Sequence, residues 1–430
     1  MLKKIDIKKD NIKKIQSLLS ISSPQSREIE KTVVAIINDV KDRGDEALVH
    51  YTEKFEGFTP KAFRVSDSEF NEAFKQCSKE LVLSLEIAAK RISEFHETQL
   101  LSNKSYSKEK IEVSTIHRPV SRAGCYVPGG RASYPSTVLM TAIPAVVAGV
   151  ENIIICTPPG AGNKVDPATL VAARIAGVQA VYAIGGAQAV AAMAYGTETV
   201  DPVDVIVGPG NAYVATAQRV VSQHVGIAAA YAGPSEIVVI ADKSANPTFA
   251  AIDLIVQAEH GPDGQSWLIS PEAETLEAIL NEIKNLVSKS KRREEIISTF
   301  ESGGFAVLVD DLHQAFKVAN LVAPEHLQLM VNEPKEYLSS IQNAGAVFLG
   351  NMAPASVGDY FAGPSHVLPT DGSARFASAL TVSDFIKDIH VIAMDESALR
   401  KAASTIRTIA EAEGLEAHAE SIRLRTEGIK

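Results

Sequence analysis

Short apolar runs alternate with longer amphipathic stretches along most of this 430-residue chain. Residues 27–100 are charged and carry apolar side chains at helical spacing, which predicts helices. From about residue 111, runs rich in Val and Ile alternate with Ala-rich helical stretches, a pattern typical of βαβ units and a parallel sheet. We therefore predict an α/β fold with two Rossmann-like βαβ domains, an N-terminal arm and a small helical C-terminal appendage.

The element boundaries follow from the same pattern. Strands are predicted at 152–157, 180–184, 204–207, 236–241, 266–270, 305–309, 327–331 and 346–349. Helices between them are predicted at 167–176, 187–195, 211–224, 247–260, 272–288 and 311–321. The last fifty residues lose the strand pattern, and helices are expected at Leu380–Lys387 and Glu396–Ala412.

Composition narrows the class of protein. Lys and Arg total 42 against 52 Asp and Glu, giving a net charge of −10, which disfavours a nucleic-acid binder. Three cysteines without CxxC spacing cannot form a disulfide framework, which is typical of a reducing compartment. The apolar run 138–150 is too short and interrupted to span a bilayer, and no signal peptide is evident. We expect a soluble, cytoplasmic protein without nucleic-acid or membrane partners.

Glycine-rich turns suggest phosphate binding. Gly208-Pro-Gly210-Asn211 and Gly185-Gly186-Ala-Gln188 each follow a predicted strand and precede a predicted helix, whose N-terminus favours anions. The third glycine of GxGxxG is missing, and such turns need glycine simply for positive φ. Tyr126-Val-Pro-Gly-Gly130 adds an aromatic ring that could stack on a planar group. A dinucleotide site and ordinary turns both stay open.

Nitrogen and oxygen donors are scattered along the chain. Gln257 and His260 share one face of a predicted helix end. With the distant Asp359 and His418 they could form a ligand set suited to zinc or manganese. A histidine near a helix C-terminus also interacts favourably with the helix dipole without any metal. Because no HxxxH or CxxC cluster is present, the spacing alone does not decide between a metal site and a histidine that only interacts with the helix dipole.

The segment Ala323-Pro-Glu325-His326 places a carboxylate beside an imidazole. Neighbours on a strand point to opposite faces, so the two share a site only where the backbone is irregular, which Pro324 favours. Imidazole suits general-base chemistry near neutral pH. A solvated Glu-His pair in a loop is the alternative.

Cysteine chemistry is a further alternative. Cys125 or Cys156 could attack an aldehyde as a thiolate. Cys156 lies in a predicted apolar strand, and neither cysteine has a cationic neighbour in sequence to activate it. We therefore interpret both as inert, buried side chains.

Nine segments carry a resemblance to a known family. They are Tyr126-Val-Pro-Gly-Gly130, Gly185-Gly-Ala-Gln188, Gly208-Pro-Gly-Asn211, Ala232-Gly-Pro-Ser-Glu236, Gln257-Ala-Glu-His-Gly-Pro262, Pro324-Glu-His326, Gly358-Asp-Tyr360, His366-Val-Leu-Pro369 and Glu413-Gly-Leu-Glu-Ala-His418. In this order and with similar gaps, across about residues 120–420, they resemble the histidinol dehydrogenase family. Each motif alone is weak, but the joint order is highly specific.

The resemblance implies an enzyme that oxidises L-histidinol to L-histidine through L-histidinaldehyde with two NAD+, the final steps of histidine biosynthesis. It implies His326 as general base and substrate contact, and Glu325 assisting water addition. The implied zinc ligands, which also contact substrate, are Gln257, His260, Asp359 and His418. The other implied contacts are Ser235, Glu413 and, more weakly, His366 for substrate, and Tyr126, Gln188 and Asn211 for NAD.

The family also implies a homodimer in which the C-terminal segment, with Glu413 and His418, completes the partner's site. The domain division we expect is an arm at 1–20, a larger α/β domain from 21–125 plus 236–378, an inserted Rossmann-like NAD-binding domain at 126–235, and a helical dimerisation segment at 379–430. Two rival classes remain: a thiol-dependent aldehyde dehydrogenase without metal, and a non-catalytic βαβ binding protein.

Overall fold

The computed structural model describes residues 1–7, 12–19, 26–129, 133–228, 235–259, 261 and 264–427. The chain forms two compact units. The larger comprises Met1–Gln99 and Ser121–Phe385, and the smaller comprises Leu100–Val120 and Ile386–Lys430. Within the described ranges, no helix is both long and apolar enough to cross a membrane.

One layer of the larger unit is a six-stranded sheet whose neighbouring strands all pair in parallel. In spatial order its strands are β1 (Lys3–Asp6), β11 (Gly304–Leu308), β10 (Gln265–Ser270), β9 (Glu236–Ala241), β12 (His326–Met330) and β13 (Ala346–Leu349). The central strands are apolar and buried, as expected when helices cover both faces of a parallel sheet.

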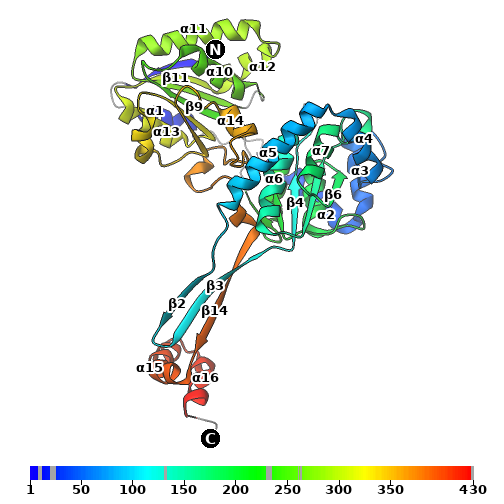
Figure 1. The fold of residues 1–430 in the computed structure, drawn as a ribbon, viewed down its shortest axis with the longest axis vertical. Helices are drawn as coiled ribbons and strands as arrows, with labels where there is room; N and C mark the ends of the chain where they lie inside the picture. The colour runs from blue at the N-terminus through cyan, green and yellow to red at the C-terminus, as the bar shows by residue number, and fades with distance from the viewer. Residues whose placement is uncertain are drawn as a thin grey trace. The chain divides into compact units, whose positions relative to one another are not determined.

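Alternate residues of each central strand supply two separate cores. In β9, Ile237 and Val239 pack with α10, α11 and α12, whereas Val238 and Ile240 pack with α1 and α13. Figure 1 shows α10, α11 and α12 on one side of this sheet and α1 and α13 on the other. These helices are α10 (Pro247–Ala258), α11 (Ala273–Lys289), α12 (Arg293–Gly303), α1 (Ile12–Leu19) and α13 (Leu312–Val322). The alternation follows from the two-residue period of a strand.

The larger unit also contains a five-stranded sheet, in which neighbouring strands again pair in parallel. Its spatial order is β6 (Ala180–Ala183), β5 (Asn152–Thr157), β4 (Arg122–Tyr126), β7 (Val205–Val207) and β8 (Gly226–Ile227). The crossover helices are α6 (Pro135–Ala148), α7 (Pro167–Ile175), α8 (Gly186–Tyr195) and α9 (Ala212–Val221).

The N-terminal helices pack on this five-stranded sheet system. Helix α2 contacts α8 and α9, α4 contacts α7, and α5 contacts α6. The four helices are α2 (Ser26–Arg43), α3 (Asp45–Glu56), α4 (Asp67–Gln76) and α5 (Lys79–Glu97). The remaining short elements of the larger unit are η1 (Ala161–Asn163), η2 (Pro334–Ser340), α14 (Ala355–Tyr360), η3 (Ser373–Arg375) and η4 (Val382–Phe385).

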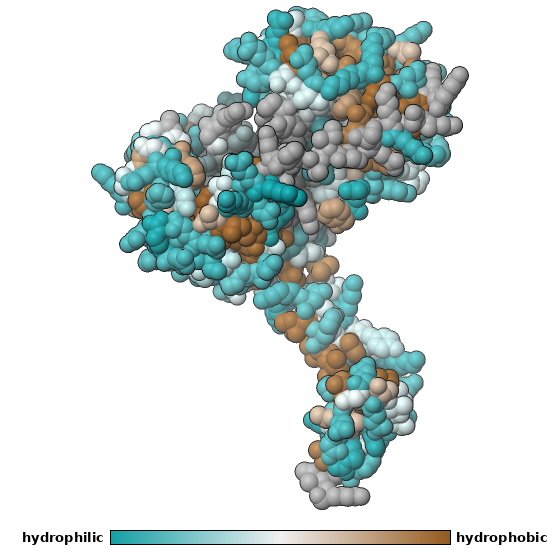
Figure 2. Space-filling model, turned by 180° about the vertical axis from the view of Figure 1, so that it is seen from behind, coloured by the Kyte–Doolittle hydropathy of each residue, from teal (hydrophilic) through white to brown (hydrophobic). Residues whose placement is uncertain are grey.

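The smaller unit is a three-stranded antiparallel sheet with two helices. Its strands, in the order β14 (Ile386–Met394), β3 (Ile111–Pro119) and β2 (Lys104–Lys108), are followed by α15 (Glu396–Ala412) and α16 (Glu416–Glu427). Several apolar side chains of this unit are exposed, among them Ile392 at 71% and Ile409 at 56%. Figure 2 shows apolar surface over the strands and helices of this unit.

The predicted fold class is confirmed, and all eight predicted strands are found within one residue of the predicted limits. The helix at Glu396–Ala412 is also confirmed. The helix predicted at Leu380–Lys387 is wrong, because η4 and the start of β14 occupy this segment. Strand β14 pairs along its whole length with β3, more than 260 residues earlier, and no local pattern announces such a partner. The division into four domains stays a prediction.

Candidate active site

Irregular backbone before β12 brings Glu325 and His326 to one cavity. Ala323, the C-cap of α13, has a φ of 50° in the left-handed region, and Pro324 follows it. Glu325 and His326 are 9% and 4% exposed. Both border a polar cavity of about 730 Å³ in the larger unit. The two side chains therefore share a site although they are neighbours in sequence.

The hydrogen bonds of His326 define which ring nitrogen carries a proton. Nδ1 lies 3.2 Å from the main-chain oxygen of Glu236, and a carbonyl oxygen can only accept, so Nδ1 donates. Nε2 makes no hydrogen bond within the described residues and lies 3.8 Å from Oδ1 of Asp359. In the neutral imidazole, the basic lone pair is consequently on Nε2.

Two carboxylates dominate the electrostatics of His326. Burial lowers the pKa of the imidazole, but Glu325 and Asp359 outweigh this effect and raise the pKa to about 10. Oε2 of Glu325 lies 3.5 Å from Nδ1. With both carboxylates ionised, His326 is therefore held as a cation near neutral pH.

Other predicted site residues line the same cavity. They are Asn211, Ser235, Gln257, Asp359 and His366. Gln257 is buried in the last turn of α10, and Asp359 belongs to α14.

Hydrogen bonds fix the state of His366. Its Nδ1 lies 3.1 Å from the Asp359 carbonyl oxygen, and its Nε2 lies 3.3 Å from Thr137 Oγ1. Burial lowers the pKa of His366. We therefore interpret it as a neutral imidazole with both nitrogens bonded.

Three predicted residues cannot be placed at this cavity from the structure. His260 lies outside the described residues. Glu413 is the C-cap of α15, and His418 is an exposed residue in the first turn of α16, both in the smaller unit. Over the part of the chain that the structure describes, no three His, Cys, Asp or Glu side chains gather closely enough to hold a metal ion.

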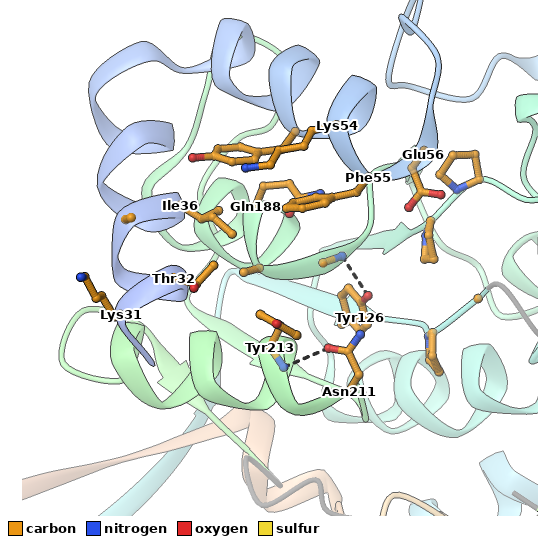
Figure 3. Close-up of a pocket in the computed structure, with 18 of the residues that line it drawn as sticks. Lys31, Thr32, Ile36, Lys54, Phe55, Glu56, Tyr126, Gln188, Asn211 and Tyr213 are labelled. Carbon is orange, nitrogen blue, oxygen red and sulfur yellow. Dashed lines mark hydrogen bonds between the residues drawn. The ribbon is translucent and has the colours of Figure 1, made fainter. Parts of the chain in front are cut away.

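A second cavity, of about 890 Å³, lies at the carboxyl ends of β4 and β6 and at the N-termini of α8 and α9. It is lined by Tyr126, Gln188 and Asn211 (Figure 3). The Tyr126 hydroxyl accepts a hydrogen bond from the N–H of Gly186 at 3.0 Å. Oδ1 of Asn211 caps α9 by accepting from the N–H groups of Tyr213 and Val214. The Tyr126 ring itself is only 4% exposed.

The N-terminal helices contribute a wall that sequence reasoning missed. Thr32 of α2 and Lys54 and Phe55 of α3 line this second cavity (Figure 3). Tyr51 of α3 lines it as well. The rings of Tyr51 and Phe55 are stacked, with centroids 5.7 Å apart and an interplanar angle of 15°. The i, i+4 spacing of these two aromatic residues on a charged helix was the sequence feature that could have indicated this wall.

Close backbone approach requires glycine at one of the predicted turns. Gly208 has a φ of 111°, and a Cβ there would lie 2.1 Å from the main-chain oxygen of Tyr126. The strand ending in Tyr126 and the turn before Asn211 are thus in direct contact. No larger residue fits this position without moving one of the two.

The cysteines are poor nucleophiles. Cys125 and Cys156 are fully buried. Burial raises the pKa of Cys125 to about 12, and it raises the pKa of Cys156 as well. Both thiols are therefore protonated near neutral pH, which opposes the thiol-dependent alternative.

Parallel sheets flanked by helices, with a buried carboxylate–imidazole pair in a polar cavity, define an α/β enzyme. The family model for histidinol dehydrogenase matches residues 20–426. The chain belongs to the histidinol dehydrogenase family. The predicted family is therefore confirmed, and so is the prediction that the protein is an oxidoreductase.

Individual relatives cover nearly the whole chain. It is 45% identical to histidinol dehydrogenase of Clostridium acetobutylicum, over 97% of this chain and 96% of the relative. It is 44% identical to the enzyme of Methanocaldococcus jannaschii, over 95% of each chain. The crystal structure of histidinol dehydrogenase from Elizabethkingia anophelis is similar with a TM-score of 0.94 and 35% identity, covering 99% and 98% of the two chains.

Proposed function

We propose that this chain oxidises L-histidinol to L-histidine through L-histidinaldehyde with two NAD+, completing histidine biosynthesis. The observation that carries the proposal is the adjacency of the two cavities, whose linings share Pro128 and Asn211. A cofactor in the larger cavity would reach toward the acid–base pair in the polar one. Membership of the family supports histidinol as substrate.

NAD occupies the larger cavity. Residues Tyr126, Gln188 and Asn211 contact it, and the N-termini of α8 and α9 favour its phosphates. The lining also holds Lys31 and Lys54 together with Glu28 and Glu56. Residues 126–235 would thus form the NAD-binding domain, inserted in the larger α/β domain of 21–125 and 236–378.

The donor set fits zinc. Gln257 and Asp359 border the polar cavity with an amide and a carboxylate oxygen, and His260 and His418 add imidazole nitrogens, which zinc prefers together with carboxylate. A zinc ion held by these residues would supply Lewis acidity and help to orient the substrate. Ser235, which also lines this cavity, contacts the substrate, and the ring of His366 borders the same space.

Acid–base chemistry falls to the Pro-Glu-His turn. Neutral His326 takes the alcohol proton at Nε2 while the hydride leaves the carbon for the nicotinamide. Burial already lowers the His326 pKa, and a cation at Asp359 would offset the part of the opposing rise that this carboxylate causes, which favours the neutral imidazole. Once His326 has released its proton to solvent and a second NAD+ has replaced NADH, Glu325 would assist water addition to the aldehyde. His326 would then take the proton of the hydrate as the second hydride leaves.

The smaller unit joins two chains. Exposed apolar side chains such as Val391, Ile392 and Ile409 form a surface suited to a second copy. In the homodimer, residues 379–430 dimerise, and Glu413 and His418 complete the site of the partner.

Mixing two inactive variants tests the shared site. In a hybrid of His326→Asn and His418→Ala chains, one site carries both substitutions and the other carries neither. Random pairing would then restore about one quarter of wild-type activity, since half the dimers have one intact site. No recovery after verified exchange of chains would show that each site uses one chain only.

A metal-dependent assay tests the reaction itself. The purified protein should form NADH and histidine from L-histidinol and NAD+. Chelator treatment should abolish this activity, and added zinc should restore it. Full activity in metal-free protein, or no histidine from the zinc-loaded protein, would contradict the proposal.

A further inference from the structure

Glu236 lies directly behind the acid–base pair, at the first position of β9. Its N–H donates to Oε2 of Glu325 at 3.0 Å, and its carbonyl oxygen accepts from Nδ1 of His326 at 3.2 Å. Parallel pairing of β9 with β12 sets His326 opposite Ile237, the next residue. Since one residue holds both members of the pair, a small shift of this backbone would move both side chains.

The side chain of Glu236 extends from this backbone toward the turn at Asp371 and Gly372. It is 2% exposed, its Oε2 has no hydrogen-bond partner within the described residues, and the N–H groups of Asp371 and Gly372 lie close enough to its carboxyl to lower its pKa. These consecutive residues have φ of 54° and 68°. Successive N–H groups in such a turn form a concavity that binds an anionic or polar oxygen. The Glu236 carboxyl therefore lies beside the turn at 371–372.

Charge around Glu236 is consistent with a supporting role. Burial, together with the facing carboxylates of Glu325 and Asp371, raises the pKa of Glu236 to about 8, while the two N–H groups oppose this shift. The third titratable group beside it is His326, bonded to its carbonyl oxygen. Near neutral pH Glu236 is thus mostly protonated, so that Glu325 remains the carboxylate beside the imidazole.

We propose that Glu236 is a positioning residue for the reaction: its carboxyl anchors the first residue of β9 to the Asp371–Gly372 turn, and that anchored backbone orients Glu325 and fixes the His326 proton on Nδ1. This inference rests on the proposed function, because the proposed function gives Glu325 and His326 their catalytic roles. Glu236 itself touches no reacting atom in this account.

Three substitutions of Glu236 separate positioning from bulk stability. Glu236→Ala removes the acceptor, and a misplacement of about 1 Å can cost on the order of 100-fold in rate, so kcat should fall by roughly 10–100-fold. The KM for histidinol should stay within about threefold of wild type, because Gln257, Asp359 and Ser235 are unchanged. Glu236→Gln keeps an acceptor oxygen of the same reach and should keep kcat within about threefold. Glu236→Asp shortens the reach and should give an intermediate kcat.

Glu272→Ala serves as the matched control. Glu272 also has a buried carboxyl oxygen without a partner in the described residues, and it precedes α11, away from the acid–base pair. Its replacement should lower the melting temperature without lowering kcat. Zinc content and melting temperature are measured for every variant, and Glu236→Asp carries the test if Glu236→Ala fails to fold.

The outcomes are distinct. A wild-type protein that does not oxidise histidinol would overturn the proposed function, and this inference with it. An active wild type with kcat unchanged in Glu236→Ala or Glu236→Asp would overturn this inference alone. A Glu236→Gln variant as slow as Glu236→Ala would also overturn it, because an acceptor in the right place would then be insufficient.

Discussion

Oε2 of Glu325 lies 3.5 Å from Nδ1 of His326 while accepting the N–H of Glu236. The carboxylate thus stabilises positive charge on the imidazole from the Nδ1 side, and Nε2 faces Asp359. This arrangement gives the two side chains different tasks. In the proposed reaction, His326 would accept and release protons at Nε2, and Glu325 would support the imidazolium before it assists water addition.

Replacing His326 by Asn should remove the base and keep much of the side-chain volume. Both half-reactions should slow by roughly 10²–10⁴-fold, the usual contribution of a general base. Single-turnover NADH formation from histidinol and from added histidinaldehyde measures the two steps. His313→Asn, on the exposed surface of α13, is the control. Near-normal turnover with unchanged zinc content would refute the assignment.

Replacing Glu325 by Gln should separate the two oxidations. Only the aldehyde must be hydrated, so oxidation of added histidinaldehyde should lose more rate, by about 10²-fold, than oxidation of histidinol. The amide oxygen can still accept the N–H of Glu236, which preserves the local backbone. Equal losses in both single-turnover steps would count against this division of labour.

Cys125→Ala and Cys156→Ala should both remain active. Each removes one buried sulfur, which costs on the order of 1 kcal/mol of stability, but neither removes a reacting group. In the folded protein at pH 8, iodoacetamide should modify these two thiols far more slowly than in urea, because the raised pKa of Cys125 and the burial of both keep them protonated and inaccessible. Lost activity with an intact fold would revive the thiol mechanism.

Asp253 should make the folded state less stable as the pH rises. It is 4% exposed in α10, and burial raises its pKa from 3.8 to about 6. The folded protein therefore binds more protons than the unfolded chain between these values, and stability falls through this window, by at most roughly 3 kcal/mol. Asp253→Asn should lack this loss.

Urea unfolding at pH 4 and pH 7 measures the effect of Asp253. The difference in unfolding free energy between Asp253→Asn and wild type should move in favour of the variant by about 1–3 kcal/mol at the higher pH. Asp42→Asn, on the exposed face of α2, controls for a general charge effect. An identical pH slope in Asp253→Asn and wild type would contradict the assigned pKa shift.

Sequence patterns predicted the parallel sheets well because each buried strand is a short Val/Ile run whose burial is a local property. They also predicted the motifs that border the two cavities, such as Gly208-Pro-Gly-Asn211. They failed where a partner far along the chain decides the structure. Strand β14 exists through pairing with β3, and the α3 wall of the larger cavity depends on packing against distant elements. The left-handed conformation of Ala323 could not be predicted either, because only glycine signals such a conformation in a sequence.

The stoichiometry of NADH formation tests the central claim most directly. With limiting L-histidinol, excess NAD+ and the zinc-loaded protein, the reaction is followed to its end and both NADH and histidine are measured. The account predicts two NADH and one histidine per histidinol consumed. One NADH with accumulated aldehyde, or no NADH at all, would contradict it.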